Sequence, residues 1–428
     1  MSTPLPWGDI QPPWTIGQVK HLGSITLGKM LQTKDTGQDV FAPYMRAANV
    51  QPDGVLALDD VKEMWFSPGE LNDLTLRQGD VVVVEGGQGG FGRAAYVGED
   101  LDGWGFQNSI NRVRPDAGND GRFLAYYLIA LRATGFVRRY CNVVSMPHLT
   151  AEKLAAIPVP LTSGPEQQAV ADYLDRETAE IDNLIAAQER FIGLLQERRQ
   201  AVVEHELATA VPAVPDTRLK HLVRSVRQGW SPQCFPWPGD GVQTWAVLKA
   251  GAANRGIFRP EENKELPEDL EPRPSTVVRS GDLLVSRANT RDLVGSAAVV
   301  SGDYPRLMLS DKLYALALDK SKAVPRYVAH LMAGRRVRDL IEMAASGASA
   351  SMLNISRDEI VNLPMNVPEL AEQSRILNRL DRETAEIDSL IAKTQRHIEL
   401  AKERRIALIT AAVTGQIEIM KGPEPWGT

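Results

Sequence analysis

The sequence predicts an α+β chain in which two tandem mixed α/β modules are joined by two long antiparallel coiled-coil helices, giving a pseudo-two-fold internal repeat. Three observations predict this fold. The 428 residues are about three times the size of a usual single domain. The eight residues Asp175–Asp182 recur letter for letter at Asp381–Asp388. Two long segments, 166–208 and 372–414, contain no proline and are rich in strong helix formers.

The internal repeat covers nearly the whole chain. Residues 166–201 align with residues 372–407 at 21 identical positions out of 36. Upstream, Gly79-Asp80 corresponds to Gly281-Asp282 at an offset of 202. A period of about 200 residues is far longer than that of a solenoid repeat and describes a duplicated domain with its connector.

Each copy divides into a variable module followed by a long helix. In the modules, short apolar runs such as Val81–Val84 and Leu283–Val285 are separated by clusters of Gly, Asn and Asp, which is typical of strands joined by hairpins. The expected boundaries are 1–160 for the first module, 161–211 for the first helix, 212–365 for the second module and 366–428 for the second helix with its tail.

The apolar residues of both long segments recur at spacings of seven with an interleave of three or four, which indicates pairing of the two helices as a coiled coil. The alternative is that each helix packs on its own module. The positions expected to pair are Leu174, Ile181, Ile185, Ile192, Leu195, Leu380, Ile387, Ile391 and Ile398.

No motif argues for a catalytic residue, a metal site or a bound cofactor. Gly87, Gly89 and Gly92 form a GxGxxG pattern after a strand, but a strand rather than a helix is expected to follow it, so a hairpin loop is the simpler interpretation. A nucleotide-dependent oxidoreductase that uses these glycines stays open as an alternative. The chain has only two cysteines, and its six histidines form no ligand pair. No apolar run approaches the ~20 residues of a membrane span, and no export signal is visible, so a cytoplasmic protein is expected.

Four features together resemble the specificity subunit of type I restriction-modification systems. They are the whole-chain duplication, the Gly-Asp signature in each module, the entry to each helix, and the helix that reads Leu-Asp-Arg-Glu-Thr-Ala-Glu-Ile-Asp and continues to Glu-Arg-Arg. The entries are Ile157-Pro158…Glu166-Gln167 and Leu363-Pro364…Glu372-Gln373. The resemblance covers roughly residues 15–420, with one departure: a glutamine often found before Asn-Ile-Ser in this family is Leu353 here.

The resemblance implies two target-recognition domains, each of which reads one half of a split double-stranded DNA sequence. It also implies that the helices set the gap between the halves and bind two modification (methyltransferase) subunits, which restriction/translocase subunits then join. The chain itself would be non-catalytic and would hold no cofactor, and S-adenosylmethionine, ATP and Mg would reside on the partners. No membrane partner is expected.

Base recognition needs side chains with forked donors or paired donor and acceptor groups. Net charge is −6 for the chain, yet residues 216–355 carry 20 Lys and Arg against 15 Asp and Glu, whereas residues 1–150 carry 13 against 16. Because phosphate neutralisation dominates affinity, weak DNA binding by the isolated chain is expected. The DNA-binding candidates are Arg46, Gln88, Arg93, Gln107, Asn108 and Arg112 in the first module, and Lys249, Arg287, Asn289, Arg291, Asp311 and Lys312 in the second.

Two other functions compete with this interpretation. The chain could be a DNA-recognition adaptor for another modification or nuclease enzyme, which the sequence does not separate from a type I subunit. It could also be a coiled-coil scaffold that binds only proteins.

Overall fold

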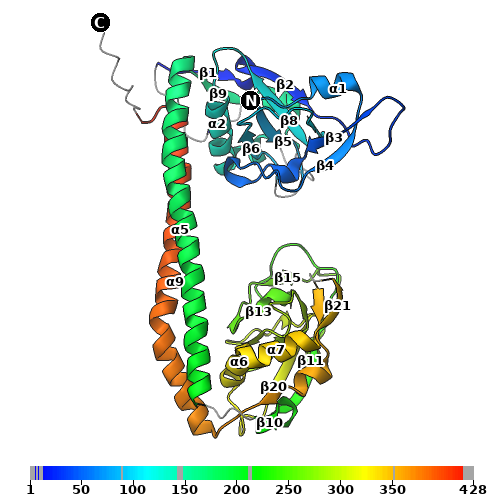
Figure 1. Cartoon of the computed structure of the whole chain (residues 1–428), viewed down its shortest axis with the longest axis vertical. Helices are drawn as coiled ribbons and strands as arrows, with labels where there is room; N and C mark the ends of the chain where they lie inside the picture. Colours follow the sequence, from blue (N-terminus) through cyan, green and yellow to red (C-terminus); the bar gives the residue numbers. More distant parts are fainter. Residues whose placement is uncertain are drawn as a thin grey trace. The chain divides into compact units, whose positions relative to one another are not determined.

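The computed structural model describes residues 5, 8, 13–87, 90–141, 148–210, 215–349 and 352–417. The chain divides into two compact units. The first comprises residues 1–189 together with 395–428, and the second comprises residues 190–394. Each unit contains one globular part and a segment of each of two long helices, α5 (Gly164–Ala210) and α9 (Leu370–Val413) (Figure 1).

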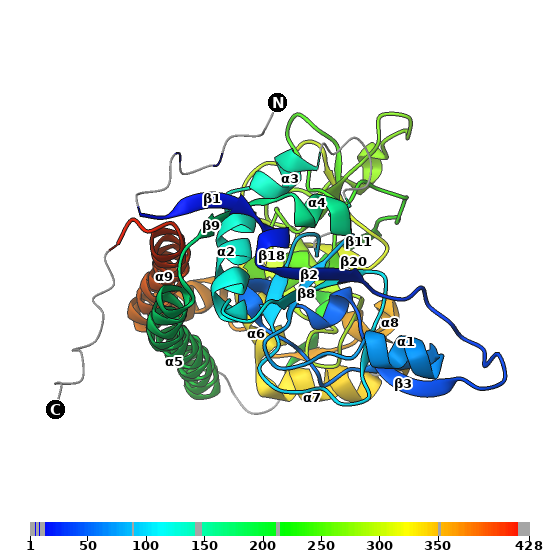
Figure 2. The ribbon, with the colours of Figure 1, turned by 90° about the horizontal axis from the view of Figure 1, so that it is seen from above.

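The globular part of the first unit is built on a four-stranded antiparallel sheet. A three-stranded sheet and a two-stranded ribbon complete it, and α1 (Pro68–Asp73) lies beside the three-stranded sheet (Figures 1 and 2). In spatial order the strands are β2 (Gly23–Leu27), β8 (Ile110–Pro115), β5 (Val81–Val84) and β6 (Ala94–Tyr96); β4 (Lys62–Phe66), β3 (Val40–Met45) and β7 (Gly105–Phe106); and β1 (Thr15–Gln18) with β9 (Pro158–Leu161).

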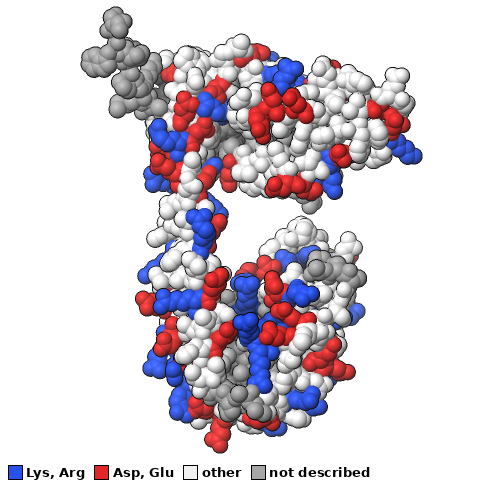
Figure 3. Space-filling view, in the orientation of Figure 1, with Lys and Arg blue, Asp and Glu red and all other residues white. Residues whose placement is uncertain are grey.

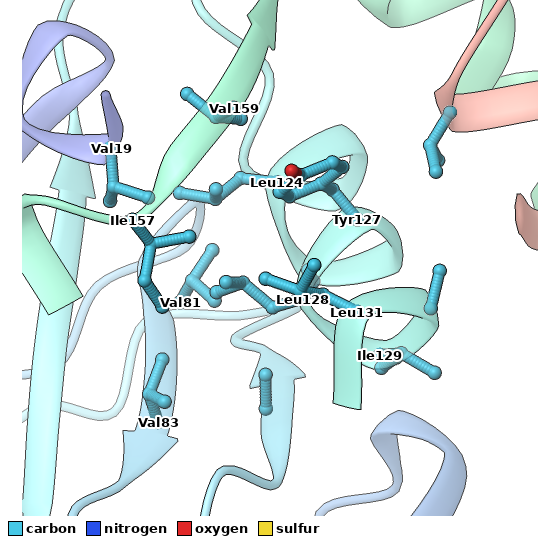
Figure 4. Packing of buried hydrophobic residues seen from close by; sticks show 14 of the residues in the cluster. Val19, Val81, Val83, Leu124, Tyr127, Leu128, Ile129, Leu131, Ile157 and Val159 are labelled. Carbon is cyan, nitrogen blue, oxygen red and sulfur yellow. The ribbon is translucent and has the colours of Figure 1, made fainter. Parts of the chain in front are cut away.

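The central strand β5 is apolar at every position because both faces of its sheet are covered. Val81 and Val83 face the layer that contains α2 (Gly121–Ala133), and Val82 and Val84 face the three-stranded sheet. All four side chains are at most 1% exposed, so the run of valines follows from burial on two sides. Residues shown packing around α2 in Figure 4 include Val19, Leu124, Tyr127, Leu128, Ile157 and Val159.

The second unit repeats this order of elements. Its four-stranded antiparallel sheet runs β11 (Val223–Gln228), β20 (Leu313–Leu318), β16 (Leu283–Ser286), β18 (Ala297–Val299), and its three-stranded sheet runs β15 (Asn263–Glu265), β12 (Ala246–Leu248), β19 (Leu307–Met308). The other elements of the unit are β10 (Thr217–Arg218) with β23 (Pro364–Met365), β13 (Ala253–Asn254) with β14 (Ile257–Phe258), β17 (Ala288–Asn289) with β22 (Met352–Asn354) and β21 (Ser346–Ser349), and the helices α6 (Pro325–Ala333), α7 (Arg335–Ala344) and α8 (Arg357–Val361). In the first unit the corresponding short helices are α3 (Phe136–Tyr140) and α4 (Ala151–Ala155). The predicted mixed α+β class is confirmed.

The Gly-Asp signature forms the turn that leads into each central strand. Gly79 and Gly281 have φ angles of 97° and 87°, which glycine adopts at low cost. Asp80 is 1% exposed and accepts hydrogen bonds at 2.8 Å from the backbone N–H of Arg77 and from the Arg114 guanidinium. In the second unit Asp282 is buried in the same way and pairs with the guanidinium of Arg227, which lies on β11. The signature is therefore structural: a buried carboxylate satisfied by its own turn and by an arginine from another strand.

The GxGxxG pattern lies in the connection between β5 and β6, which pair as an antiparallel hairpin. Gly87 and Gly92 belong to this connection, and Gly89 lies outside the described residues. A strand and not a helix follows the glycines, so they do not open a helix as a dinucleotide-binding turn would, and the hairpin interpretation is confirmed.

The two long helices span nearly the predicted segments, with 47 and 44 residues. In the first unit, Asp182 of α5 pairs with Arg405 of α9, with 2.9 Å between Oδ1 and Nε. In the second unit, Arg199 of α5 pairs with Asp388 of α9 at 2.7 Å, and Glu206 pairs with Arg379 at 2.6 Å. Residue numbers rise along α5 as they fall along α9, so the helix segments within the second unit are antiparallel.

These ion pairs follow the sequence repeat. Asp182 corresponds to Asp388, and Arg199 corresponds to Arg405, both at an offset of 206. The ion pair Asp182–Arg405 of the first unit is therefore equivalent to the ion pair Asp388–Arg199 of the second unit, with the roles of the two helices exchanged.

Most of the predicted pairing positions are buried within the unit to which they belong. Leu174 and Leu380 are 0% and 1% exposed and join clusters that also contain side chains of the globular part. The helix ends therefore contact both the other helix and the module, a combination of the two arrangements considered above. Ile181, Ile185, Leu195, Ile387 and Ile398 are also buried, and Ile192 and Ile391 are half-buried.

A buried glutamine fixes the start of each long helix to its module. Gln167 is 0% exposed; its amide accepts from the backbone N–H of Asp120 at 3.0 Å and donates to Thr162 O at 3.0 Å and Asn119 Oδ1 at 3.1 Å. Gln373, also 0% exposed, makes the equivalent bonds to Val324 N, Pro368 O and Lys322 O. This explains the glutamine of the Glu-Gln entry motif, because its amide accepts one hydrogen bond and donates two at the same place.

Among the described residues, no helix has the length and apolar character that crossing a membrane would require.

Replacing Gln167 with alanine is expected to destabilise the first unit by about 3 kcal/mol, because two buried backbone groups lose their hydrogen-bond partners. The neighbouring Gln168 is exposed, so Gln168→Ala is a matched control that should change the free energy of unfolding little. Urea unfolding of both variants measures the difference. Equal stability of the two variants would contradict the role assigned to Gln167.

Candidate nucleic-acid interface

Three of the six predicted DNA-binding residues of the first unit lie together at one edge of the four-stranded sheet. β5 ends at Val84, and its antiparallel neighbours β8 and β6 begin at Ile110 and Ala94, so these strand ends meet. Arg93, Gln107 and Asn108 directly precede the two neighbours and therefore lie at this edge, which we call the first reading edge. Gln88 lies outside the described residues.

The second unit brings its candidates to the equivalent edge, the second reading edge, where β16 ends and β20 begins. The backbone N–H of Arg287 donates to Lys312 O at 2.8 Å, and its Nη1 donates to Asp311 O at 3.3 Å. Asn289 Nδ2 donates to Ser286 Oγ at 3.2 Å, and Arg291 is exposed farther along the loop. The structure thus gathers Arg287, Asn289, Asp311 and Lys312 in one place.

Arg112 does not belong to this surface, contrary to the expectation. It is 5% exposed; its Nη1 donates to the carbonyls of Asp73 and Thr75 at 2.9 and 3.0 Å, and its Nη2 donates to Thr26 Oγ1 at 3.1 Å. Burial also lowers the pKa of this guanidinium below its usual range. Arg112 therefore holds the loop around α1 against the sheet, and this geometry counts against a role in reading bases.

Two further DNA-binding candidates, Arg46 in the first unit and Lys249 in the second, already have acidic partners. Arg46 Nη2 lies 2.6 Å from Asp60 Oδ2, and Lys249 Nζ lies 3.7 Å from Glu262 Oε2. Both pairs are at least partly exposed, with 78% of the Asp60 side chain and 39% of the Lys249 side chain accessible. Such pairs contribute little to stability, so either cation could exchange its carboxylate for a phosphate at low cost.

Three residues at the first reading edge were not singled out from the sequence: Glu85, Ser109 and His148. Glu85 directly follows β5, its N–H donates to Ser109 O at 2.9 Å, and its carboxylate lies 3.8 Å from His148 Nδ1. Burial raises the pKa of Glu85 above its usual value. The signal that could have found it is the repeat, because Glu85 aligns with Arg287 at the same offset of 202 as the Gly-Asp signature.

Basic side chains are concentrated on one part of the second unit. Figure 3 shows Lys and Arg side chains gathered where α6 and α7 lie in Figure 1. Arg335 and Arg336 at the start of α7 are both exposed. Together with the excess of cations in residues 216–355, this gives the second unit a surface suited to polyanions.

The modules differ in how they are anchored to the helices. In the first unit, Arg122 of α2 reaches the carboxylates of Asp172 and Asp175 on α5, each at 2.7 Å, and Tyr126 donates to Asp175 at 2.7 Å. In the second unit, Arg326 reaches only Asp381 among the described residues, at 2.5 Å.

Tyr126 is replaced in the second unit by His330, at the same offset of 204 that relates Arg122 to Arg326. Burial, together with the nearby cations Arg326 and Arg199, lowers the pKa of His330 to about 4. The imidazole is therefore neutral at pH 7.

A second anchor distinguishes the units. Asp53 and Arg255 are the two non-glycine residues with a positive φ among those described, at 63° and 51°, and they correspond at an offset of 202. The Asp53 carbonyl accepts from Arg405 Nη2 at 3.3 Å, and its carboxylate lies 4.0 Å from Arg405 Nη1. The Arg255 side chain carries the opposite charge, so it cannot form the equivalent ion pair with Arg199, the counterpart of Arg405. The Arg199 side chain is 30% exposed, whereas that of Arg405 is 8% exposed.

The described residues contain no group of three or more His, Cys, Asp or Glu side chains placed to hold a metal ion. Among the described residues, Cys141 and Cys234 are free thiols.

Comparisons with known proteins bear on these two units. Residues 12–189 match the family model described as type I restriction modification DNA specificity domain. Over these residues the chain is therefore similar to a type I DNA specificity domain. The resemblance inferred from the sequence is confirmed.

Curated specificity subunits are similar to part of the chain. The chain is 30% identical over 178 residues to the type I restriction enzyme EcoEI specificity subunit of Escherichia coli, a match that covers 42% of this chain and 30% of the relative. It is 25% identical over 174 residues to the StySPI specificity subunit of Salmonella potsdam, covering 40% of this chain and 36% of the relative. The matched segments thus span about a third of the length of these relatives.

A solved structure shares the fold beyond the specificity domain. It is described as showing complex assembly and conformational transition of the type I R-M system, and the similarity has a TM-score of 0.56 at 18% identity. It covers 96% of this chain and 100% of the solved chain.

Acidification is expected to weaken the second unit through His330. The folded-state pKa of about 4 lies below the unfolded value of 6.5, so the contribution to stability is complete above pH 6.5 and is lost as the pH falls towards 4. The loss is about 2 kcal/mol by pH 5. Hydrogen exchange of peptides from α6 at pH 7 and pH 5 measures it. His330→Phe should reduce this pH dependence, whereas His397→Phe, at an exposed position, should not. An unchanged pH dependence in His330→Phe would contradict the assignment.

Proposed function

We propose that this chain is the sequence-specific DNA-binding subunit of a type I restriction-modification complex. Each unit reads one half of a bipartite target in double-stranded DNA. The helices act as a coiled coil that sets the gap between the halves and binds methyltransferase subunits. Restriction/translocase subunits complete the assembly. The chain is non-catalytic in this proposal, and S-adenosylmethionine, ATP and Mg reside on its partners.

The observation that carries this proposal is the repetition of the specificity-domain fold outside the matched residues. The second unit has the same sheet order, the same buried Gly-Asp turn and the same glutamine anchor as the first. At the reading edges, however, the two units differ in side-chain chemistry. A protein that reads two different half-sites needs two copies of the same fold that carry different polar side chains.

A stiff helix suits the role of a spacer. At ~1.5 Å per residue, α5 is about 70 Å long. Half-sites separated by about one turn of B-DNA lie ~34 Å apart, and readers joined by a flexible linker would not keep a fixed spacing. The pseudo-two-fold relation of the ion pairs Asp182–Arg405 and Arg199–Asp388 supports an arrangement in which the two modules face equivalent partners.

The helices also expose apolar side chains at equivalent places. In the first unit Leu184 and Leu400 are 51% and 45% exposed, and in the second Leu390 and Leu194 are 38% and 63% exposed. Leu184 corresponds to Leu390 and Leu194 to Leu400, both at an offset of 206. Each unit therefore presents one leucine from each helix, which we call a leucine patch. Two equivalent patches suit two copies of the methyltransferase subunit.

The charge distribution supports DNA over protein as the ligand of the second unit, with Arg335 and Arg336 on the exposed side of α7. A coiled-coil scaffold that binds only proteins would not need this surface. A DNA-recognition adaptor for a different modification or nuclease enzyme would use the same reading edges and would differ only in its partner. A cytoplasmic location follows from the proposal and stays a prediction.

Sequencing of methylated adenines in cells with and without the chain, expressed with its methyltransferase partner, tests the proposal. We expect a bipartite motif that depends on this chain. Exchange of residues 216–355 for another module should change one half of the motif only. Methylation that is identical with and without the chain would overturn the proposal, and co-purification of an enzyme of another class would favour the adaptor.

Substitution of the leucine patches is expected to remove methyltransferase subunits one at a time. Leu184→Arg places a charge in the first patch and should lower the number of bound copies from two to one, and Leu184→Arg combined with Leu390→Arg should remove both. Asn183→Arg is the matched control, because Asn183 is an exposed neighbour outside the patch. Native mass spectrometry of the complex counts the copies. Two copies retained in the double variant would exclude the patches as the docking sites.

A further inference from the structure

The residue that directly follows the central strand is held in the same way in both units. The N–H of Glu85 donates to Ser109 O at 2.9 Å, and the N–H of Arg287 donates to Lys312 O at 2.8 Å. On the other side, Leu149 N donates to Glu85 O at 2.7 Å, and Ile355 N donates to Arg287 O at 3.0 Å. Glu85 and Arg287 therefore occupy equivalent positions in the two units, each held by backbone hydrogen bonds on both sides.

The aligned positions of the two modules divide into two kinds. The glycine and aspartate of the Gly-Asp turn and the buried glutamine at the helix entry are the same in both units, as Gly79 and Gly281 show. The residues at the reading edges are not: the pairs are Glu85 with Arg287, Asn108 with Asp311, Ser109 with Lys312, and His148 with Asn354. The last pair is placed by the isolated bridge of Gly86 with His148 and by the pairing of Ala288 with Asn354. Comparison of the two copies thus separates residues that the fold requires from residues that it leaves free to vary.

At the fixed position the two side chains have opposite hydrogen-bonding character. A carboxylate only accepts, and a guanidinium only donates. Glu85 keeps 17% of its side chain exposed beside His148, which is 53% exposed. Arg287 is half-buried, and its bond to Asp311 O at 3.3 Å is long, so the guanidinium has donors to spare. A charge reversal at a position with an unchanged backbone changes what can be bound there without changing the fold.

Each side chain matches a base that the major groove exposes. Cytosine presents an N4 amino donor, which Glu or Asp accepts from, and guanine presents the O6 and N7 acceptors, which Arg contacts in a bidentate manner. We propose that Glu85 and Arg287 are the equivalent base-reading residues of the two units, Glu85 accepting from the amino group of a cytosine in the first half-site and Arg287 donating to a guanine in the second. This inference rests on the proposed function and deepens it.

The wild-type complex of the chain with its methyltransferase partner provides the first test. Once the methylated motif is known, duplexes are made with N4-methylcytosine at each cytosine of the first half-site, and with 7-deazaguanine at each guanine of the second. We expect one cytosine and one guanine whose modification weakens binding about fivefold to a hundredfold. Because no residue of the protein changes, loss of folding cannot produce this result.

Variants then assign the effect to the two residues. In the Arg287→Gln variant, 7-deazaguanine at the sensitive position should cause no further loss of DNA-binding affinity. Discrimination between bases should relax at that base pair alone. Glu85→Gln should relax one base pair of the first half-site and leave the second half unchanged. Glu99→Gln and Arg279→Gln, at exposed positions by the opposite end of the central strands, are matched charge controls that should leave the motif intact.

The outcomes separate this inference from the function on which it rests. If the wild-type chain directs a bipartite motif, but no modified base is sensitive, or the sensitivity persists in Arg287→Gln and Glu85→Gln, then the assignment of the two readers is wrong and the function stands. If no methylation depends on the chain, both are wrong.

Discussion

The attachment of each globular part to the helix that follows it is the constraint on which the rest of the structure depends. A buried amide, Gln167 or Gln373, bonds to the backbone of the module and to that of the helix entry at once. Arg122 of α2 and Arg326 of α6 then reach carboxylates on the long helix of their own unit. Because these bonds are made inside one unit, the orientation of a module relative to its helix segments is set by directional contacts and not by apolar packing alone.

The side chains at the reading edges can vary independently of the core because of the way the central sheet is buried. With β5 covered on both faces, the strand ends are the part of the sheet whose side chains can vary without loss of core packing. The residue after the central strand is glutamate in one unit and arginine in the other, while the Gly-Asp turn at the opposite end of the strand is unchanged. Binding chemistry can therefore diverge between the copies while the fold of each remains the same.

The sequence was sufficient for the features that repeat or have a regular period. The long helices lie within a few residues of the segments 166–208 and 372–414, because helix propensity and absence of proline are local properties. The burial of Arg112 could not be predicted from the sequence. Its hydrogen-bond acceptors are the carbonyls of Asp73 and Thr75, far away in the chain, so nothing local distinguishes Arg112 from an exposed arginine. Glu85 was missed for another reason: a carboxylate has neither forked donors nor a paired donor and acceptor, the groups by which most of the candidates were chosen.

The charge of residue 53 and of its counterpart 255 has an evolutionary consequence. A module moved by recombination from the second place to the first would bring an arginine against Arg405, which is nearly enclosed and already paired with Asp182. A module moved in the other direction would bring an aspartate towards Arg199, a favourable pairing. Shuffling of modules between the two places in a gene of this kind is therefore easier in one direction than in the other.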